Sequence, residues 1–332
     1  MAMKVVIPLA GFGTRLRPHT FTKPKPLVNV AGKPVLAHIL DSLAGLDVEE
    51  TIFIVGHLGD RIQEYVNANY SFPARYVEQH ELKGQAHALH LAREHLTGPI
   101  LIIFVDTIFE ADLRHLPTDC DGVLYVKEVE DPRRFGVAIL EGGYISRLVE
   151  KPATPVSNLA VIGVYYLREA ERLAAAIEEL LERNIQTKGE YFLADALQLM
   201  INDGAKFRAE TVDVWEDCGK PETVLQTNRY LLTKTGGHAG NAKDSIIVPP
   251  VYIADSAHVE HSVIGPYVTI AEGAVVRRSI IRDSIINAGA CIEDAMLNLS
   301  LIGDNARVRG SYEQLNVGDS SMVDATGNGY EE

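Results

Sequence analysis

The sequence is poor in cysteine, in long apolar runs and in positive charge. Its three cysteines, Cys120, Cys218 and Cys291, are far apart and odd in number, which argues against a disulfide framework or a zinc site. No apolar run approaches the length of a membrane span, and the first residues lead into a short apolar strand without the features of a signal peptide. We therefore expect a cytoplasmic protein.

The shortage of positive charge also limits the kinds of partner. The chain has 31 Lys and Arg against 45 Asp and Glu, a formal net charge of −14. Such an acidic surface argues against nucleic acid or an anionic membrane as the main partner. A phosphate ligand is still compatible, because a few local cations and backbone N–H groups can outweigh a distant field.

The first two-thirds of the 332 residues alternate strand and helix patterns. We expect strands at 5–7, 51–55, 74–78 and 100–105, and helices at 34–44, 59–69 and 85–95. This alternation predicts a Rossmann-like α/β domain with a mostly parallel sheet. Ligands of such sheets bind beyond the carboxyl ends of the strands, so the loops after Leu9 and Val105 are the first candidates.

The pattern changes near residue 236, where a glycine-rich stretch, residues 236–240, predicts a flexible connector. Beyond it, eleven aliphatic residues recur every five or six positions: Ile253, Val259, Ile264, Ile270, Val276, Ile281, Ile286, Ile292, Leu297, Ile302 and Val308. This period predicts a short parallel β-helix of about four coils, and the near-regular register argues against a β-sandwich. We expect domains at 1–235 and 245–324, followed by a frayed tail at 325–332.

The segment after the first strand carries residues that suit an anion. Gly11 and Gly13 let backbone N–H groups converge, Thr14 adds a hydroxyl, and Arg15 and Lys25 supply positive charge. The P-loop pattern of NTPases is absent here, and the dinucleotide fingerprint lacks its third glycine. By itself, a pair of glycines could be only a tight turn.

A wider set of motifs closely resembles the sugar-1-phosphate nucleotidylyltransferases. Residues 11–20 and 23–26 resemble the signature of that family, most closely in its long glucose-1-phosphate thymidylyltransferases with a C-terminal left-handed β-helix. Further matches follow in order at 79–84, 106, 135–137, 150–152 and 215–222. One departure is Val105, which stands where the family usually has glycine and would narrow the space near the nucleotide.

The resemblance implies transfer of a nucleotidyl group from an NTP to a sugar 1-phosphate, with Mg²⁺ as cofactor and pyrophosphate as the second product. It implies nucleotide-binding roles for Leu9, Ala10, Gly11, Gly13, Thr14, Arg15, Gln79 and Gly84. It implies sugar-phosphate-binding roles for Gly136, Glu150 and Lys151, catalytic roles for Arg15, Lys25 and Asp106, and metal binding by Asp106 and Asp217.

The chemistry of this reaction agrees with those residue types. Both reactants are anions, so the protein must neutralise charge and align them. Mg²⁺ takes a few carboxylates plus waters and phosphate oxygens, which Asp106 and Asp217 could supply, although either could be a cap or a turn residue. Arg15 suits the departing pyrophosphate and Lys25 the reacting phosphates, whereas Lys151 alone would be read as a surface lysine.

Several alternatives remain open from the sequence. Thymine and uracil differ by one methyl group, which the motifs do not distinguish, so dTTP is expected by resemblance only. Glucose 1-phosphate is likewise expected by resemblance. UTP- or GTP-dependent enzymes of the UDP-glucose or GDP-mannose type are alternatives, as is a non-catalytic relative that binds a nucleotide sugar and regulates a partner. A second activity in the β-helix, acyl transfer as in bifunctional relatives, is a further alternative. The sequence shows no long loop there with an obvious catalytic histidine, which argues against it. We expect a homo-oligomer through the β-helix, whose coil edges need covering.

Overall fold

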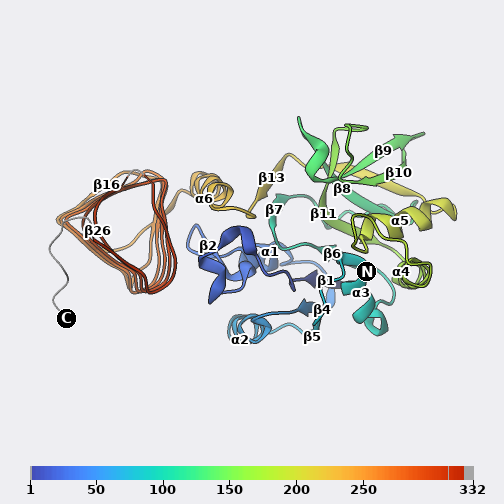
Figure 1. Ribbon diagram of the computed structural model, residues 1–332, viewed down its shortest axis with the longest axis horizontal. Coiled ribbons are helices and arrows are strands. Elements are labelled where there is room, and N and C mark those ends of the chain that lie inside the picture. The colour runs from blue at the N-terminus through green and yellow to red at the C-terminus, as the bar shows by residue number, and fades with distance from the viewer. Residues whose placement is uncertain (1, 313, 325–332) are drawn as a thin grey trace. The chain divides into compact units, whose positions relative to one another are not determined.

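The computed structural model describes residues 2–312 and 314–324, and the predicted frayed tail, 325–332, lies outside them. The chain divides into two compact units, one formed by residues up to Phe12 with Leu40–Trp215, and the other by Gly13–Ile39 with the residues from Glu216 onward. Figure 1 labels many of their elements. The domain limits 1–235 and 245–324 stay a prediction. No helix of the described residues is long and apolar enough to cross a membrane.

The first unit is built on a nine-stranded sheet with the order β10-β9-β11-β6-β1-β4-β5, in which β8 also pairs with β11, and β12 with β8. Four neighbouring strands form a parallel core, as predicted: β6 (Ile100–Ile103), β1 (Met3–Pro8), β4 (Val48–Val55) and β5 (Ala74–Glu78). The inner strands β6 and β1 and the second half of β4 are rich in Val and Ile and mostly buried, which is the pattern of a sheet covered on both faces, whereas the edge strand β5 is partly exposed.

The sheet becomes mixed beyond β6. Strand β11 (Leu159–Leu167) runs antiparallel to β6, β8 and β9, and β9 runs antiparallel to β10. The remaining strands are β8 (Gly122–Glu128), β9 (Gly136–Glu141), β10 (Tyr144–Glu150), β12 (Phe207–Thr211), and the ribbon of β7 (Thr107–Glu110) with β13 (Val214–Asp217).

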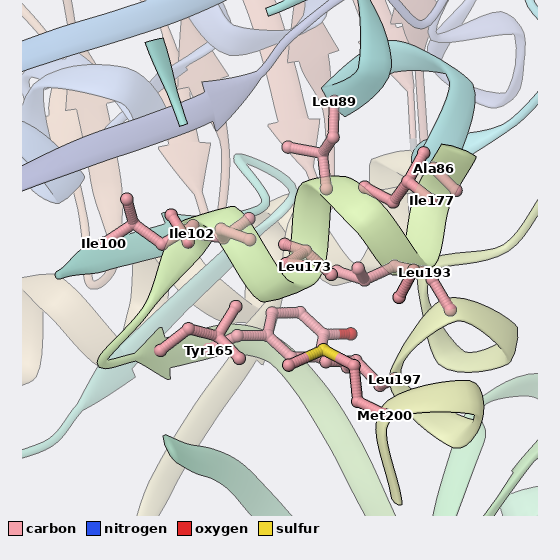
Figure 2. Packing of buried hydrophobic residues seen from close by; sticks show 14 of the residues in the cluster. Ala86, Leu89, Ile100, Ile102, Tyr165, Leu173, Ile177, Leu193, Leu197 and Met200 are labelled. Carbon is pink, nitrogen blue, oxygen red and sulfur yellow. The ribbon is translucent and has the colours of Figure 1, made fainter. Parts of the chain in front are cut away.

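Amphipathic helices pack on this sheet. They are α2 (Gly59–Asn69), α3 (Gln85–Leu91), α4 (Ala170–Glu182) and α5 (Leu193–Asn202), after α1 (Val35–Ser42) near the N-terminus. Figure 2 shows that Leu173 and Ile177 on α4 lie between Leu89 of α3 and the apolar face of α5. Each such side chain contributes about 1.5–3 kcal/mol when fully buried.

The second unit contains the predicted parallel β-helix, and it has more coils than expected. One of its three faces is a six-stranded parallel sheet: β14 (Gly237–Ala239), β17 (Val251–Ile253), β20 (Val268–Ile270), β23 (Ile285–Ile286), β25 (Leu301–Ile302) and β27 (Asn316–Val317). Ile253, Ile270, Ile286 and Ile302 are in register on successive strands and fully buried. The estimate of about four coils was therefore low.

The other two faces share the long strands β24 and β26. One contains β15 (Ala242–Lys243), β18 (His258–Glu260), β21 (Val275–Arg277), β24 (Cys291–Asn298), β26 (Arg307–Tyr312) and β28 (Met322–Asp324). The third face contains β16 (Ile246–Ile247), β19 (Val263–Ile264) and β22 (Ile280–Arg282), together with β24 and β26. Serine side chains link successive coils at one corner of the β-helix. Ser262 Oγ accepts a hydrogen bond from the backbone N of Ser279, and Ser279 Oγ accepts one from the backbone N of Ala295, both at 3.1 Å.

The glycine-rich stretch at 236–240 is not a flexible connector. Helix α6 (Pro221–Thr235) ends at Gly236, and β14 begins at once as the first strand of the β-helix, paired with β17. At Gly237, φ is +74° and an added Cβ would lie 2.0 Å from the carbonyl oxygen of Val251. This glycine is explained by the close approach of two coils.

The N-terminal segment 13–39 belongs to this unit and contains β2 (Asn29–Val30) and β3 (Lys33–Pro34). It contacts α6 and the β-helix through Asn228, which is almost fully buried. Asn228 Oδ1 accepts from the backbone N of Ala31 at 2.8 Å and from Thr269 Oγ1 at 2.7 Å.

Candidate active site

A cleft of about 680 Å³ opens in the first unit where three parallel strands end. Ala10 follows β1, His57 follows β4 and Gln79 follows β5, and all three line the cleft. Phe12 and Tyr76 add aromatic surface. The predicted nucleotide residues Ala10 and Gln79 therefore share one cavity at the carboxyl edge of the sheet, where such sheets bind ligands.

Gln79 is buried and held at both ends. Its backbone N donates to the carbonyl oxygen of Val55 at 2.7 Å, and its Nε2 lies 3.4 Å from Nδ1 of His87 on α3. Burial lowers the pKa of His87, so its ring is neutral at pH 7 and can accept from the Gln79 amide. The helical pattern over 85–95 gives no indication of this contact, because it reports the spacing of apolar residues and not the packing of α3 against the end of β5.

The other predicted nucleotide residues of this unit have clear local roles. Leu9 is buried, with its backbone N donating to Ile54 at 2.7 Å, and Gly11 is exposed. Gly84 has φ +112°, and an added Cβ would lie 2.5 Å from the carbonyl oxygen of Tyr191. That close backbone packing explains this glycine, and its contact with a nucleobase stays a prediction.

The predicted sugar-phosphate residues lie together. Gly136 at the start of β9 pairs directly with Glu150 at the end of β10, and an added Cβ at Gly136 would lie 2.8 Å from Glu150 Oε2. Lys151 Nζ lies 3.4 Å from Glu150 Oε1 and 4.6 Å from the ring centroid of Phe192. Lys151 also has φ +44°, an uncommon conformation for lysine that costs about 1–3 kcal/mol and is typical of functional sites.

Two further acidic groups shape the charge of this cluster. Burial raises the pKa of Glu150, opposed by the charge of Lys151, while the nearby Asp195 raises it further. Burial also raises the pKa of Asp195, whose Oδ2 is buried and has no hydrogen-bond partner among the described residues. Such an unsatisfied buried acceptor is available to a ligand hydroxyl.

Tyr165 links this cluster electrostatically to Asp106. Asp106 follows the buried strand β6 and is half-buried, and Tyr165 is buried on β11 beside β6. Burial raises the pKa of Tyr165, and the carboxylates of Glu150 and Asp106 raise it further. Both carboxylates therefore act on its hydroxyl, an interaction that no sequence pattern predicts. Val105, the departure from the family pattern, is buried and does not line the cleft.

The remaining predicted residues belong to the second unit. Gly13 has φ +61°, and an added Cβ would lie 2.9 Å from Cβ of Lys25, so this glycine lets the two stretches approach. Thr14 and Arg15 are exposed on the 3₁₀ turn Thr14–Leu16, and Lys25 is half-buried.

Asp217, the second predicted metal ligand, ends β13. Its Oδ1 accepts from the backbone N of Gly219 at 2.8 Å, and an added Cβ at Gly219 would lie 2.7 Å from the same oxygen. The described residues hold no cluster of three or more His, Cys, Asp or Glu that could bind a metal ion. Two separate aspartates suit Mg²⁺, which takes few protein ligands and completes its shell with waters and phosphate oxygens.

Comparison with known proteins shows which family the chain resembles. Residues 4–234 match the family described as "Nucleotidyl transferase", and residues 233–283 match "GlmU-like, C-terminal hexapeptide". The chain is 35% identical over 243 residues to the UTP–glucose-1-phosphate uridylyltransferase of Haloferax volcanii, covering 70% of this chain and 98% of that protein.

A second relative matches over more of the chain. The glucose-1-phosphate thymidylyltransferase of Streptomyces antibioticus is 31% identical over 330 residues, covering 95% of this chain and 86% of that protein. Among solved structures, a UDP-glucose pyrophosphorylase complexed with UDP-glucose shares the fold with a TM-score of 0.60 at 24% identity, covering 70% of this chain and all of that one. The chain belongs to the nucleotidyl transferase family and carries a GlmU-like hexapeptide region over residues 233–283.

Proposed function

We propose that this chain is a Mg²⁺-dependent sugar-1-phosphate nucleotidylyltransferase that converts dTTP and glucose 1-phosphate into dTDP-glucose and pyrophosphate. The observation that carries the proposal is the partly buried cluster of Glu150, Lys151 and Asp195. The carboxylates of Glu150 and Asp106 both raise the pKa of Tyr165. Carboxylate acceptors suit sugar hydroxyls, and the ammonium of Lys151 suits the phosphate.

The proposed reaction is an in-line displacement at the α-phosphorus of the NTP. An oxygen of the sugar phosphate forms the new P–O bond, and the bond from the α-phosphorus to the bridging oxygen of pyrophosphate breaks. No general base is needed, because the attacking oxygen is already ionised near pH 7. Lys151 would hold the sugar phosphate, Lys25 the reacting phosphates, and Arg15 the departing pyrophosphate.

Asp106 and Asp217 are the proposed ligands for the metal ion. Mg²⁺, when bound, would polarise the α-phosphate and offset the negative charge of the leaving group. For Asp217, the hydrogen bond from Gly219 fixes one carboxylate oxygen and leaves the other for a ligand. The proposed nucleotide contacts are those of the cleft residues Ala10 and Gln79, the backbone around Leu9, Gly11, Gly13 and Gly84, and the side chain of Thr14.

The test is pyrophosphate release with glucose 1-phosphate, Mg²⁺ and each of dTTP, UTP, GTP, ATP and CTP, with EDTA as a control. Turnover with one or two nucleotides that EDTA abolishes supports the proposal and names the base. Relatives named for UTP and for thymidylyl transfer both match the chain, so UTP is the first alternative. No release with glucose, mannose, galactose or N-acetylglucosamine 1-phosphate would refute catalysis and favour a binding role.

We also propose that the protein is a homo-oligomer that associates through its β-helix. Ile246, Val263, Ile280 and Met296 are in register on neighbouring coils of one face and point outward, with Ile246 63% and Met296 53% exposed. The identical row of a second copy matches this row in spacing and apolar character. Size-exclusion chromatography with light scattering tests the proposal, and a monomer would refute it.

A further inference from the structure

The stretch between Arg15 and Lys25 contacts the far end of the β-helix, within the second unit. His19 Nε2 lies 2.6 Å from Asn316 Oδ1. Thr22 donates to Asp319, and Lys23 Nζ lies 2.6 Å from Asp304 Oδ2. The three β-helix residues come from the last coils, nearly 300 residues along the chain from their partners.

These contacts are close and partly shielded from water. His19 is 4% exposed, and burial lowers its pKa, so its neutral ring donates from Nε2 to Asn316. Pro18 packs so closely on the last coils that an added Cβ at Gly318 would lie 2.9 Å from the Pro18 Cβ.

The β-helix side of the contact is itself well held. Asp319 Oδ1 accepts from the backbone N of Asp304 at 2.7 Å, and the backbone N of Ser320 donates to the Asp304 carbonyl oxygen at 2.7 Å. Asp304 and Asp319 thus belong to one turn of adjacent coils, which holds the Asp319 carboxylate and the Asp304 backbone in place beside Thr22 and Lys23.

The segment itself has little regular structure to fix its position. Its backbone forms only short 3₁₀ turns, Thr14–Leu16, His19–Phe21 and Lys25–Leu27. Such turns are short and have poorer hydrogen-bond geometry than an α-helix, so they hold the segment less firmly. External contacts must supply the remaining constraint.

We propose that the last coils of the β-helix act as a brace that positions Arg15 and Lys25 for the NTP, with Asp304, Asn316 and Asp319 as positioning residues. The expected effect on nucleotide affinity rests on the proposed function, whereas the contact between the last coils and residues 13–27 does not depend on it. Such bracing gives the last coils of the β-helix a direct part in nucleotide binding, besides assembly.

The experiment compares Asp304→Asn and Asn316→Ala with the control Asp294→Asn in the full-length protein. Asp294 lies in the same β-helix, where it forms ion pairs with Arg278 and Arg309 instead of with the 13–27 stretch. Two quantities are measured: amide hydrogen exchange of residues 13–27, and the KM for each substrate, using dTTP or whichever NTP gives turnover.

The brace predicts faster exchange in residues 13–27 for both test variants and wild-type exchange there for the control. It also predicts a KM for the NTP raised about tenfold or more, with the KM for the sugar phosphate nearly unchanged, because only the NTP-binding cations lose their position. A general loss of stability would instead change exchange throughout the unit and shift the control as well.

Unchanged exchange in residues 13–27 would overturn the brace, and faster exchange with an unchanged NTP KM would overturn its role in binding. If the wild-type protein turns over no nucleotide, the proposed function fails by itself. The exchange experiment then still decides whether the brace exists.

Discussion

The Glu150 side chain is largely buried, and burial of its ionised carboxylate lowers the stability of the folded protein. Burial raises its pKa above the ordinary value of 4.5, so the folded protein binds this proton more tightly than the unfolded chain. Between the unfolded and folded pKa values the native state carries more protons, and stability therefore falls as pH rises through that window. A group held in this way at neutral pH is better explained by ligand binding than by stability.

We expect Glu150→Gln to keep or raise the melting temperature at pH 7 and to remove the fall in stability on raising the pH from about 4.5. The same variant should raise the KM for the sugar phosphate by about tenfold or more, because a hydroxyl acceptor is lost. Thermal unfolding from pH 4 to 8 and steady-state kinetics measure the two effects. A melting temperature several degrees lower would show that the carboxylate is structural.

Arg15 presents the opposite case, an exposed side chain proposed to act only on the ligand. Arg15→Ala should lower kcat by about 10²–10³, the usual cost of removing one preorganised charge-stabilising group. Its free energy of unfolding should stay within about 0.5 kcal/mol of wild type, as for most surface substitutions. Arg15→Lys should recover part of the rate, and full activity of Arg15→Ala would exclude the assigned role.

At the scale of elements, the sequence predicts regular segments well and contacts between distant segments poorly. The bounds of α2 and β5 agree with the predicted 59–69 and 74–78, and the turn-forming Ser71 and Pro73 lie between the two elements. By contrast, nothing in the sequence indicates that 13–39 joins the unit of the β-helix, since His19 and Asn316 are separated by 297 positions. The contacts of Tyr165 and His87 span shorter separations, but they too depend on packing between elements, which local patterns do not report.

The stretch at 236–240 shows how a composition rule can mislead. Glycines usually indicate flexibility, but Gly237 lies where two coils approach. The adjacent Gly236 also has positive φ, at +76°, with nothing within 4 Å of an added Cβ. A substitution at Gly237 therefore adds a steric clash to backbone strain, whereas one at Gly236 adds backbone strain alone.

We expect Gly237→Ala to destabilise the second unit by several kcal/mol, because the new Cβ meets the carbonyl oxygen of Val251. Gly236→Ala should cost only about 1–2 kcal/mol, the penalty of a left-handed conformation. Urea unfolding of both variants measures the difference. Equal, small effects would restore the flexible-connector interpretation.

For the whole molecule, the charge distribution distinguishes the faces of the β-helix. One outward row alternates in sign along successive coils: Lys243, Glu260, Arg277, Glu293, Arg309 and Asp324. Arg277 bonds Glu260 at 2.7 Å and Glu293 at 3.3 Å, so this row satisfies its charges within the chain. The face with β14, β17 and β20 contacts α6 and segment 13–39, through Asn228 and Thr269. The apolar row around Ile280 has neither kind of partner among the described residues.

Association through that apolar row is opposed by the net charge of −14, which makes two copies repel each other at long range. A contact there must therefore gain its stability from burying apolar surface, and it should be sensitive to one buried charge. We expect Ile280→Lys to reduce the molar mass measured by light scattering to that of the monomer, while kcat per chain changes little. His258→Lys places the same charge at an exposed position on the charged face and should leave the mass unchanged. If Ile280→Lys keeps the wild-type mass, the row is not the interface, and if both variants dissociate, assembly depends on total charge instead.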